Sequence, residues 1–205
     1  MEKISWRIWE SQGLGRALLI GGLLFYVPII NFLLLGYFGC WARKLIMQEG
    51  MDLPEWRDGR SIVSELGRVI VPFAVWVLLP VILASTLVWA LAGLLNFMHL
   101  GFFAGTLAWL PMVLVAVLSP PAIVVSLIRL YTGHTLKETL DIPEVIREVV
   151  RHLRECIFPL LQYYGLLVLG WPLLGFAVFL ATLPLLAQLI LVFRKMHEDL
   201  KSGAI

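Results

Sequence analysis

The chain has 205 residues, of which 60% are hydrophobic and 15% are charged, whereas a soluble domain has about 25% charged residues. Its mean hydropathy is +0.89, and the charges are clustered, so that stretches such as residues 69–95 hold none. Because about 20 apolar residues cross a bilayer, this composition predicts one all-α integral membrane domain over residues 1–205 and excludes a purely soluble protein. The net charge of +2 gives no reason to expect a nucleic-acid partner, and two cysteines make no disulfide framework.

Residues 2–12 at the start of the chain are predicted to form a short interfacial helix. Ile4 and Ile8 share one helical face, and Trp6 lies close by. Tryptophan favours the boundary between membrane and water, where its ring and its N–H group are both satisfied.

Five apolar stretches are predicted to cross the membrane. The first covers residues 17–41, and Pro28 within it predicts a kink near Tyr26, because proline removes a backbone donor. The other four cover residues 69–95, 104–131, 156–169 and 171–193, each with at least one internal proline. We therefore expect about five kinked transmembrane helices and a polar cytoplasmic tail over residues 194–205.

The first charged segment, residues 42–68, separates the first two spans. Asp52 is a candidate helix cap, and Pro54 suits the first turn of a helix, where its missing N–H group costs nothing. Apolar residues then recur at helical spacing, namely Ile62, Val63, Leu66, Val69 and Ile70. We expect an amphipathic helix on the membrane surface that leads directly into the second span.

The second charged segment, residues 129–155, contains a helix predicted to start at Pro143. Its apolar stripe consists of Val145, Ile146, Val149, Val150 and Leu153. Charged residues occupy the opposite face, where Arg147 and Arg151 are candidates for contact with the membrane surface. This is the second of two expected cytoplasmic amphipathic helices.

The basic residues indicate a topology in the cell membrane of a prokaryote. They concentrate in residues 43–68, 129–154 and 194–201, whereas the connections 96–103 and 169–173 hold none. The positive-inside rule places the basic segments and the C-terminus in the cytoplasm. Five spans put the N-terminus outside, while a re-entrant first segment puts it inside and leaves four full crossings. The charge pattern favours five spans, and both topologies stay open.

The chain contains an internal repeat. Asp52-Leu53-Pro54-Glu55-Trp56 recurs in the second half as Asp141-Ile142-Pro143-Glu144-Val145. The repeated unit is an amphipathic helix followed by an outward and then an inward span. Because these units recur in the same sense, the predicted repeat is parallel, with halves over about residues 17–95 and 104–193.

A combined motif covers much of the first half: Pro28-x-x-Asn31-x4-Gly36-Tyr37, then Arg43, then Leu53-Pro54-Glu55-Trp56. With this motif the chain resembles a family of uncharacterised prokaryotic membrane proteins, classed as a domain of unknown function. The resemblance implies a polytopic helix bundle and supplies no activity, ligand or catalytic residue. The second half follows the family in hydropathy and spacing, but Val145 stands where the first half has Trp56.

Polar residues inside the predicted spans are the candidates for a transport path. The span cores hold no Asp, Glu or Lys, which argues against proton or sodium coupling through a membrane carboxylate. Asn31, Gln162 and Gln188 are the main polar candidates. Hydrogen bonding between helices is their expected role, and a substrate path is the alternative.

We predict no catalytic residue, metal site or bound cofactor. His99, near a membrane boundary, is a weak candidate for the axial ligand of a haem or pigment. His152 and Cys156 have a spacing found in metal sites, but two ligands do not make a site. Gly101 and Gly105 form a GxxxG element that favours close helix packing, within the chain or with a partner subunit.

These observations predict a non-enzymatic integral membrane protein that acts as a scaffold or accessory subunit through helix packing and lipid contact. Its expected partners are membrane lipids, partner membrane subunits or further copies of the chain. One alternative is a small transporter for an apolar or zwitterionic solute, using Asn31, Gln162 and Gln188. Another is a membrane-shaping protein whose helices over residues 54–68 and 143–155 enter the cytoplasmic leaflet.

Overall fold

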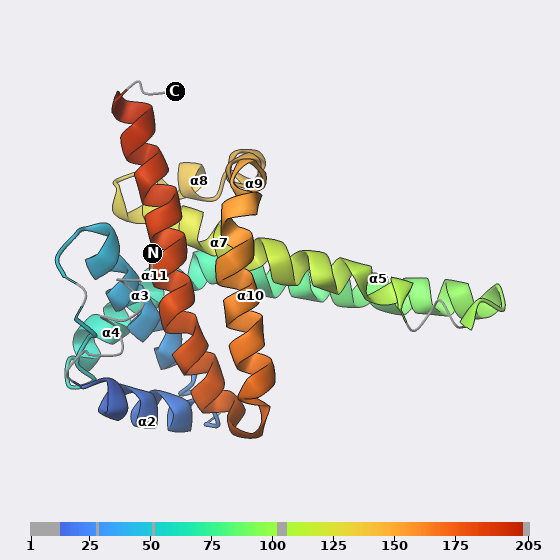
Figure 1. Ribbon diagram of the computed structural model, residues 1–205, viewed down its shortest axis with the longest axis horizontal. Coiled ribbons are helices and arrows are strands. Elements are labelled where there is room, and N and C mark those ends of the chain that lie inside the picture. The colour runs from blue at the N-terminus through green and yellow to red at the C-terminus, as the bar shows by residue number, and fades with distance from the viewer. Residues whose placement is uncertain (1–12, 28, 51, 102–105, 203–205) are drawn as a thin grey trace.

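The computed structural model describes residues 13–27, 29–50, 52–101 and 106–202, and the predicted interfacial helix over residues 2–12 lies outside this part of the chain (Figure 1). Every described element is a helix, as the sequence predicts. The α-helices are α2 (Leu14–Leu24), α3 (Phe32–Ile46), α4 (Gly59–Phe73), α5 (Leu79–Phe97), α7 (Leu110–Tyr131), α8 (Leu136–Thr139), α9 (Ile142–Arg151), α10 (Leu153–Leu169) and α11 (Leu174–Ser202). A π-helical turn, Ala74–Leu78, joins α4 to α5, and the 3₁₀ turns Leu107–Trp109 and Trp171–Leu173 precede α7 and α11.

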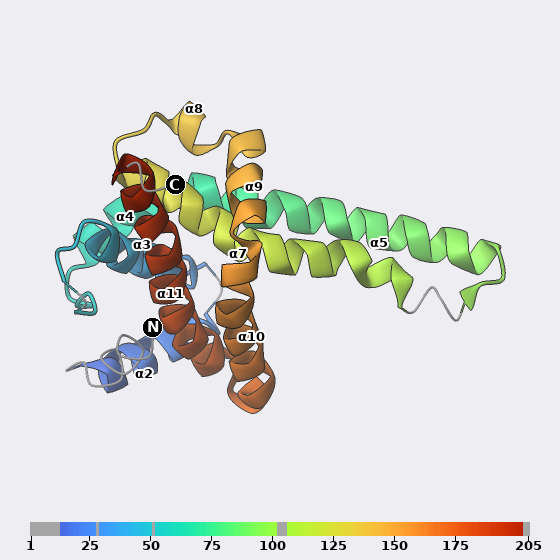
Figure 2. The same ribbon diagram turned by 45° about the horizontal axis from the view of Figure 1, so that its top comes forward.

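The helices form two hairpins and a group of shorter helices around them. Helices α5 and α7 pair along their length and project away from the rest of the protein as an arm (Figures 1 and 2). Helices α10 and α11 form a second hairpin that runs crosswise to this arm, and α2, α3 and α4 lie on the far side of α11. The packed part of the molecule is therefore at one end of the arm.

The core lies where α3, α4, α7 and α11 meet. Its largest fully buried side chains include Tyr37 and Trp41 of α3 and Phe179 and Phe193 of α11. Few side chains are buried along the arm, because among the described residues of α5 only Ala84 is buried. The apolar surface of the arm is thus left open over most of its length.

Within the part of the chain that the structure describes, three helical stretches are long and apolar enough to cross a membrane, judged by length and composition. They are Gly59–Phe97, Leu107–Tyr131 and Trp171–Arg194. The predicted span at residues 156–169 belongs to α10, whose 17 residues measure about 25 Å at 1.5 Å each. That length is slightly short of a hydrocarbon core of about 30 Å.

The first apolar stretch differs from the kinked helix predicted over residues 17–41. Helix α2 ends at Leu24 and α3 begins at Phe32, so two short helices replace one span. Ile29 between them has a φ of 71°, a left-handed conformation that a helix cannot contain. The physical reason lies in the sequence, since Pro28 lacks an N–H group and its ring disfavours helical geometry at the residue before it.

The start of α4 corrects a second prediction. The helix begins at Gly59, and the Oδ1 atom of its N-cap, Asp58, accepts a hydrogen bond from the Ser61 N–H group at 3.4 Å. Asp52 and Pro54, which the sequence suggested as the helix start, lie in the preceding loop. From Gly59 the helix continues into α5, as predicted. The π-helical turn lies between Pro72 and Pro80 and accommodates the local change in helix geometry there.

Candidate functional site

A buried carboxylate lies where three helices meet. Glu65 of α4 shares a helix face with Ile62 and Val69, and this face turns toward α3 and α7. Only 2% of Glu65 is exposed, although acidic side chains are rarely buried unless they are paired. Its surroundings therefore require partners of opposite charge or hydrogen-bond donors.

Glu65 finds those partners on its own helix and on both neighbouring helices. Arg43 of α3 donates from Nη1 to Glu65 Oε1 at 2.9 Å, and the Nη1 atom of Arg68 lies 3.5 Å from the same oxygen. The Tyr131 hydroxyl of α7 donates to Glu65 Oε2 at 2.9 Å and lies 3.3 Å from the carbonyl oxygen of Gly39. These four residues, Arg43, Glu65, Arg68 and Tyr131, are the Glu65 cluster. The hydrogen bond to Glu65 raises the pKa of the Arg43 guanidinium above its usual value, which keeps the pair charged.

Two glycines of α3 allow α4 to approach closely enough for this cluster to form. A Cβ atom at Gly36 would collide with the backbone carbonyl oxygen of Ile62. A Cβ atom at Gly39 would lie 2.7 Å from a methyl group of Val69 and 3.6 Å from the Cβ atom of Glu65. The glycine at position 36 of the sequence motif therefore serves close helix contact.

The two halves of the motif also meet in space. The ring of Tyr37, next to Gly36, stacks on the indole of Trp56 with ring centroids 4.3 Å apart and planes 13° from parallel. Such aromatic pairs stabilise a contact by about 0.5–1.5 kcal/mol beyond the area they bury. The two parts of the motif thus form an aromatic contact between α3 and the loop before α4.

A second ion-pair cluster, the Arg129 cluster, joins α7 to α8 and α9. Arg129 donates to Glu144 Oε2 and to Glu148 Oε2, each at 3.0 Å, and to the carbonyl oxygen of Glu138 at 3.1 Å. Only 12% of the Arg129 side chain is exposed. Nearby, the Ser126 hydroxyl donates to the Thr139 carbonyl oxygen at 3.1 Å. The end of α7 is therefore fixed to the following amphipathic segment by polar contacts.

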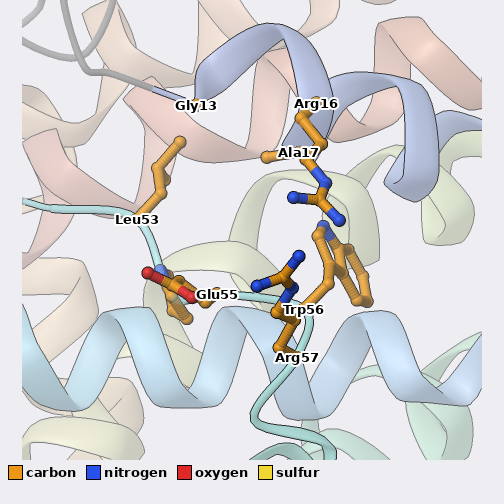
Figure 3. A pocket seen from close by; sticks show the side chains of 8 residues that line it. Gly13, Arg16, Ala17, Leu53, Glu55, Trp56 and Arg57 are labelled. Carbon is orange, nitrogen blue, oxygen red and sulfur yellow. The ribbon is translucent and has the colours of Figure 1, made fainter.

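A cavity of about 300 Å³ lies between the start of α2 and the loop before α4 (Figure 3). Its lining residues are Gly13, Arg16, Ala17, Leu53, Pro54, Glu55, Trp56 and Arg57. Two segments far apart in the sequence thus share one site, which holds two arginines and an aromatic ring.

The candidates for a transport path do not form one site. Gln188 of α11 is 5% exposed and donates from Nε2 to Gln162 Oε1 of α10 at 2.8 Å, a contact between helices. Asn31 is the N-cap residue of α3 at the break after α2, and within the described part of the chain it forms no hydrogen bond with either glutamine. The glutamines are therefore engaged with each other, apart from Asn31.

The remaining predicted residues lie at the surface. His99, which has a φ of 57°, and Gly101 are exposed in the connection at the tip of the arm, and Gly105 lies outside the described residues. Arg147 and Arg151 are exposed on α9. Among the described residues, no group of three or more His, Cys, Asp or Glu side chains is arranged to hold a metal ion.

Neither ion-pair cluster was predicted from the sequence, because Glu65 and Arg129 were treated there only as members of the charged segments 42–68 and 129–155. The helical spacing did contain a signal. Glu65 follows Ile62 by three residues and precedes Val69 by four, so it belongs to the face that these two residues bury. A charge on the apolar face of an amphipathic helix predicts a paired, buried group.

Comparison with known proteins places the chain in a family. The chain belongs to the family described as "Protein of unknown function (DUF4013)", whose model matches residues 19–192. This match confirms the predicted membership of an uncharacterised family. No curated protein and no solved structure matches the chain. Together with the three long apolar helices, the family match indicates a membrane-associated protein of unknown function.

Proposed function

We propose that the protein is a non-enzymatic, multi-pass integral membrane protein that acts as a scaffold or accessory subunit through helix packing and lipid contact. The exposed arm is the observation that carries this proposal. Large apolar side chains are exposed along both of its helices, including Leu79, Leu83, Leu87, Trp89, Leu94, Leu110, Val113 and Leu114. A continuous apolar surface of this kind marks contact with a membrane or with protein partners.

The polar groups of the packed region support a scaffold role. Glu65 and Arg129 are both engaged in ion pairs between helices, and Gln162 is bonded to Gln188. Polar contacts of this kind hold membrane helices together. None of these paired residues lines the cavity beside α2.

The contacts of the first apolar segment favour the re-entrant topology. The start of α2 shares the cavity with the loop before α4, whereas Tyr26 at the far end of α2 accepts a hydrogen bond from the Gly175 N–H group at 3.0 Å. The start of α2 and the loop that follows α3 therefore lie together, on the side that the basic residues assign to the cytoplasm. This supports a re-entrant first segment with a cytoplasmic N-terminus.

Purification of the tagged protein from its native membrane in mild detergent tests the scaffold proposal. We expect the protein to resist alkaline carbonate extraction, as integral proteins do, and to co-purify with a stoichiometric partner seen by mass spectrometry. An absorption spectrum of the same sample detects any pigment or haem. A lone, colourless particle would overturn the accessory-subunit role, and release by carbonate would overturn integral insertion.

A small transporter for an apolar or zwitterionic solute is the second candidate, and one observation favours it. The Oε1 atom of Gln188 is buried and accepts no hydrogen bond from a described residue. An unpaired buried acceptor is free to bind a polar group of a solute. If the protein is a transporter, Gln188→Leu should abolish solute uptake into proteoliposomes while the protein keeps its resistance to carbonate extraction. If the protein is a scaffold, neither the wild type nor the variant should take up solute.

A further inference from the structure

The cavity beside α2 brings two arginines together without an acidic partner. Arg16 comes from α2 and Arg57 from the loop before α4, and their guanidinium groups extend toward the same space (Figure 3). Neither arginine forms an ion pair with another described residue. Like charges that converge in this way repel each other unless an anion lies between them. The arrangement therefore favours a negatively charged ligand.

The other lining residues are consistent with an anion. The Trp56 indole lies beside both guanidinium groups in Figure 3, and its Nε1 atom is buried with no hydrogen-bond acceptor among the described residues. An unsatisfied buried donor is costly, and a bound anion would satisfy it. The Glu55 side chain extends toward Leu53, away from the two arginines. The anion would thus meet donors rather than the one nearby carboxylate.

We propose that Arg16, Arg57 and Trp56 bind a phosphate group, and that its source is the headgroup of an anionic phospholipid. Guanidinium groups bind phosphate oxygens in pairs of parallel hydrogen bonds, which makes arginine the preferred partner. Basic pockets beside membrane helices on the cytoplasmic side bind lipid headgroups in this way. The cavity volume of about 300 Å³ suits a headgroup rather than a whole lipid. The lipid source rests on the proposed membrane function, whereas the phosphate chemistry does not.

Native mass spectrometry of the full-length protein tests the site. The protein is purified in detergent and supplied in turn with phosphatidylglycerol, phosphatidylcholine and inorganic phosphate. The test variants are Arg16→Gln and Arg57→Gln, and the matched control is Arg60→Gln, which removes a positive charge that is also exposed but does not line the cavity. Arg57→Lys keeps the charge but loses the paired hydrogen bonds.

For the wild-type protein and Arg60→Gln, we expect binding of phosphatidylglycerol in preference to phosphatidylcholine. Arg16→Gln and Arg57→Gln should each lower the affinity for phosphatidylglycerol about tenfold, as expected for loss of a charge-assisted hydrogen bond, and Arg57→Lys should fall between. Inorganic phosphate binding with the same arginine dependence, but without lipid binding, would overturn the lipid source and keep the phosphate site.

Equal losses in Arg16→Gln, Arg57→Gln and Arg60→Gln would overturn the site, since binding would then depend only on net charge. Thermal unfolding of each variant shows whether a loss comes from misfolding, and an unfolded variant is replaced by its lysine counterpart. Carbonate extraction of the same membranes separates this failure from a failure of the proposed function. If the protein resists carbonate extraction but its lipid binding depends only on net charge, the proposed phosphate site is wrong and the proposed membrane function still stands.

Discussion

Asp52-Leu53-Pro54-Glu55 lies in a loop, whereas the matching Asp141-Ile142-Pro143-Glu144 opens helix α9. In the second half the Asp141 Oδ1 atom accepts a hydrogen bond from the Glu144 N–H group at 3.3 Å, as an N-cap residue should. In the first half the next residue, Trp56, stacks on Tyr37, and α4 starts only at Gly59. The comparison teaches that a capping signal decides a helix start only where the packing of the following residue agrees with it.

The two ion-pair clusters differ in the charge at their centre and in how many of their members are buried. The side chain of Glu65 is 3% exposed, and its partners Arg43 and Arg68 are 42% and 56% exposed. In the other cluster Arg129, at 12%, is buried together with Glu148, at 13%, and Glu144 is exposed at 59%. One cluster thus joins α3 and α7 to α4 around a carboxylate, and the other joins α7 to α9 around a guanidinium. A buried ion is costly when its partner is removed, so the two clusters should respond differently to loss of their exposed members.

The largest effect is expected for Arg43→Gln. This change removes the closest cation from the buried Glu65 and leaves Arg68 at 3.5 Å, so we expect a loss of about 2–3 kcal/mol in the free energy of unfolding. Glu144→Gln is the matched change in the Arg129 cluster. Glu144 is 59% exposed and Arg129 keeps Glu148, so its loss should stay below about 1 kcal/mol.

Thermal unfolding in one detergent measures both changes. The double variant Arg43→Gln with Glu65→Gln should be more stable than Arg43→Gln alone, because no uncompensated charge then remains buried. Equal stability of Arg43→Gln and Glu144→Gln would contradict the difference between the two clusters.

Gly36→Ala should rank second, since it acts on the close contact between α3 and α4. The added Cβ atom meets the backbone carbonyl of Ile62, which cannot turn aside as a flexible side chain would, so a loss of about 2 kcal/mol is expected. Gly67→Ala in α4 is the control, because a Cβ atom there has open space around it and alanine favours helix. The same unfolding assay should show Gly67→Ala unchanged or stabilised. A destabilisation of the two variants by similar amounts would refute the close contact.

The third prediction separates the two copies of the repeated sequence. Asp141→Ala removes the cap of α9 and should cost about 1 kcal/mol, whereas Asp52→Ala, in the loop, should have almost no effect. Asp58→Ala, at the observed start of α4, should resemble Asp141→Ala. Hydrogen exchange of the first-turn amides checks each helix start, and faster exchange in Asp52→Ala than in Asp58→Ala would show that α4 starts earlier.

The apolar helices could be located from the sequence because length and hydropathy are local properties. The stretch predicted over residues 104–131 corresponds to a helical stretch over Leu107–Tyr131, and that over residues 171–193 corresponds to Trp171–Arg194. For the break between α2 and α3, the sequence predicted a kink, with a re-entrant segment as the alternative. Pro28 signals an interruption, but the distance over which a chain stays non-helical depends on contacts such as that between Tyr26 and Gly175.

The sites depend on contacts between distant segments, so local patterns could not predict them. Glu65 is buried because Tyr131 of α7 packs against α4, and hydropathy does not say which helices become neighbours. The cavity exists only because Arg16 of α2 meets the loop that contains Arg57. In contrast, the pairing of Tyr37 with Trp56 gives a physical reason for a motif that the sequence shows only as a spacing.

The smallest effect concerns α8, which lies between the two helices that the Arg129 cluster joins. The Glu138 carboxylate accepts a hydrogen bond from the Thr135 N–H group at 2.8 Å, and the Thr135 hydroxyl accepts one from the Glu138 N–H group at 3.3 Å. The Thr135 N–H group and then the Thr135 hydroxyl act on the Glu138 carboxyl and lower its pKa below the usual value. A carboxyl whose pKa is lowered in the folded state contributes stability above its unfolded pKa, and this contribution disappears as the pH falls through the folded pKa. Thr135→Ala should raise the pKa of Glu138 toward the usual value, as measured by NMR titration of its carboxyl carbon, with little change in global unfolding because the group is exposed. An unchanged titration in Thr135→Ala would show that the hydroxyl takes no part in the cap, and the Arg129 cluster and the bond from Ser126 to Thr139 would then hold this end of α7.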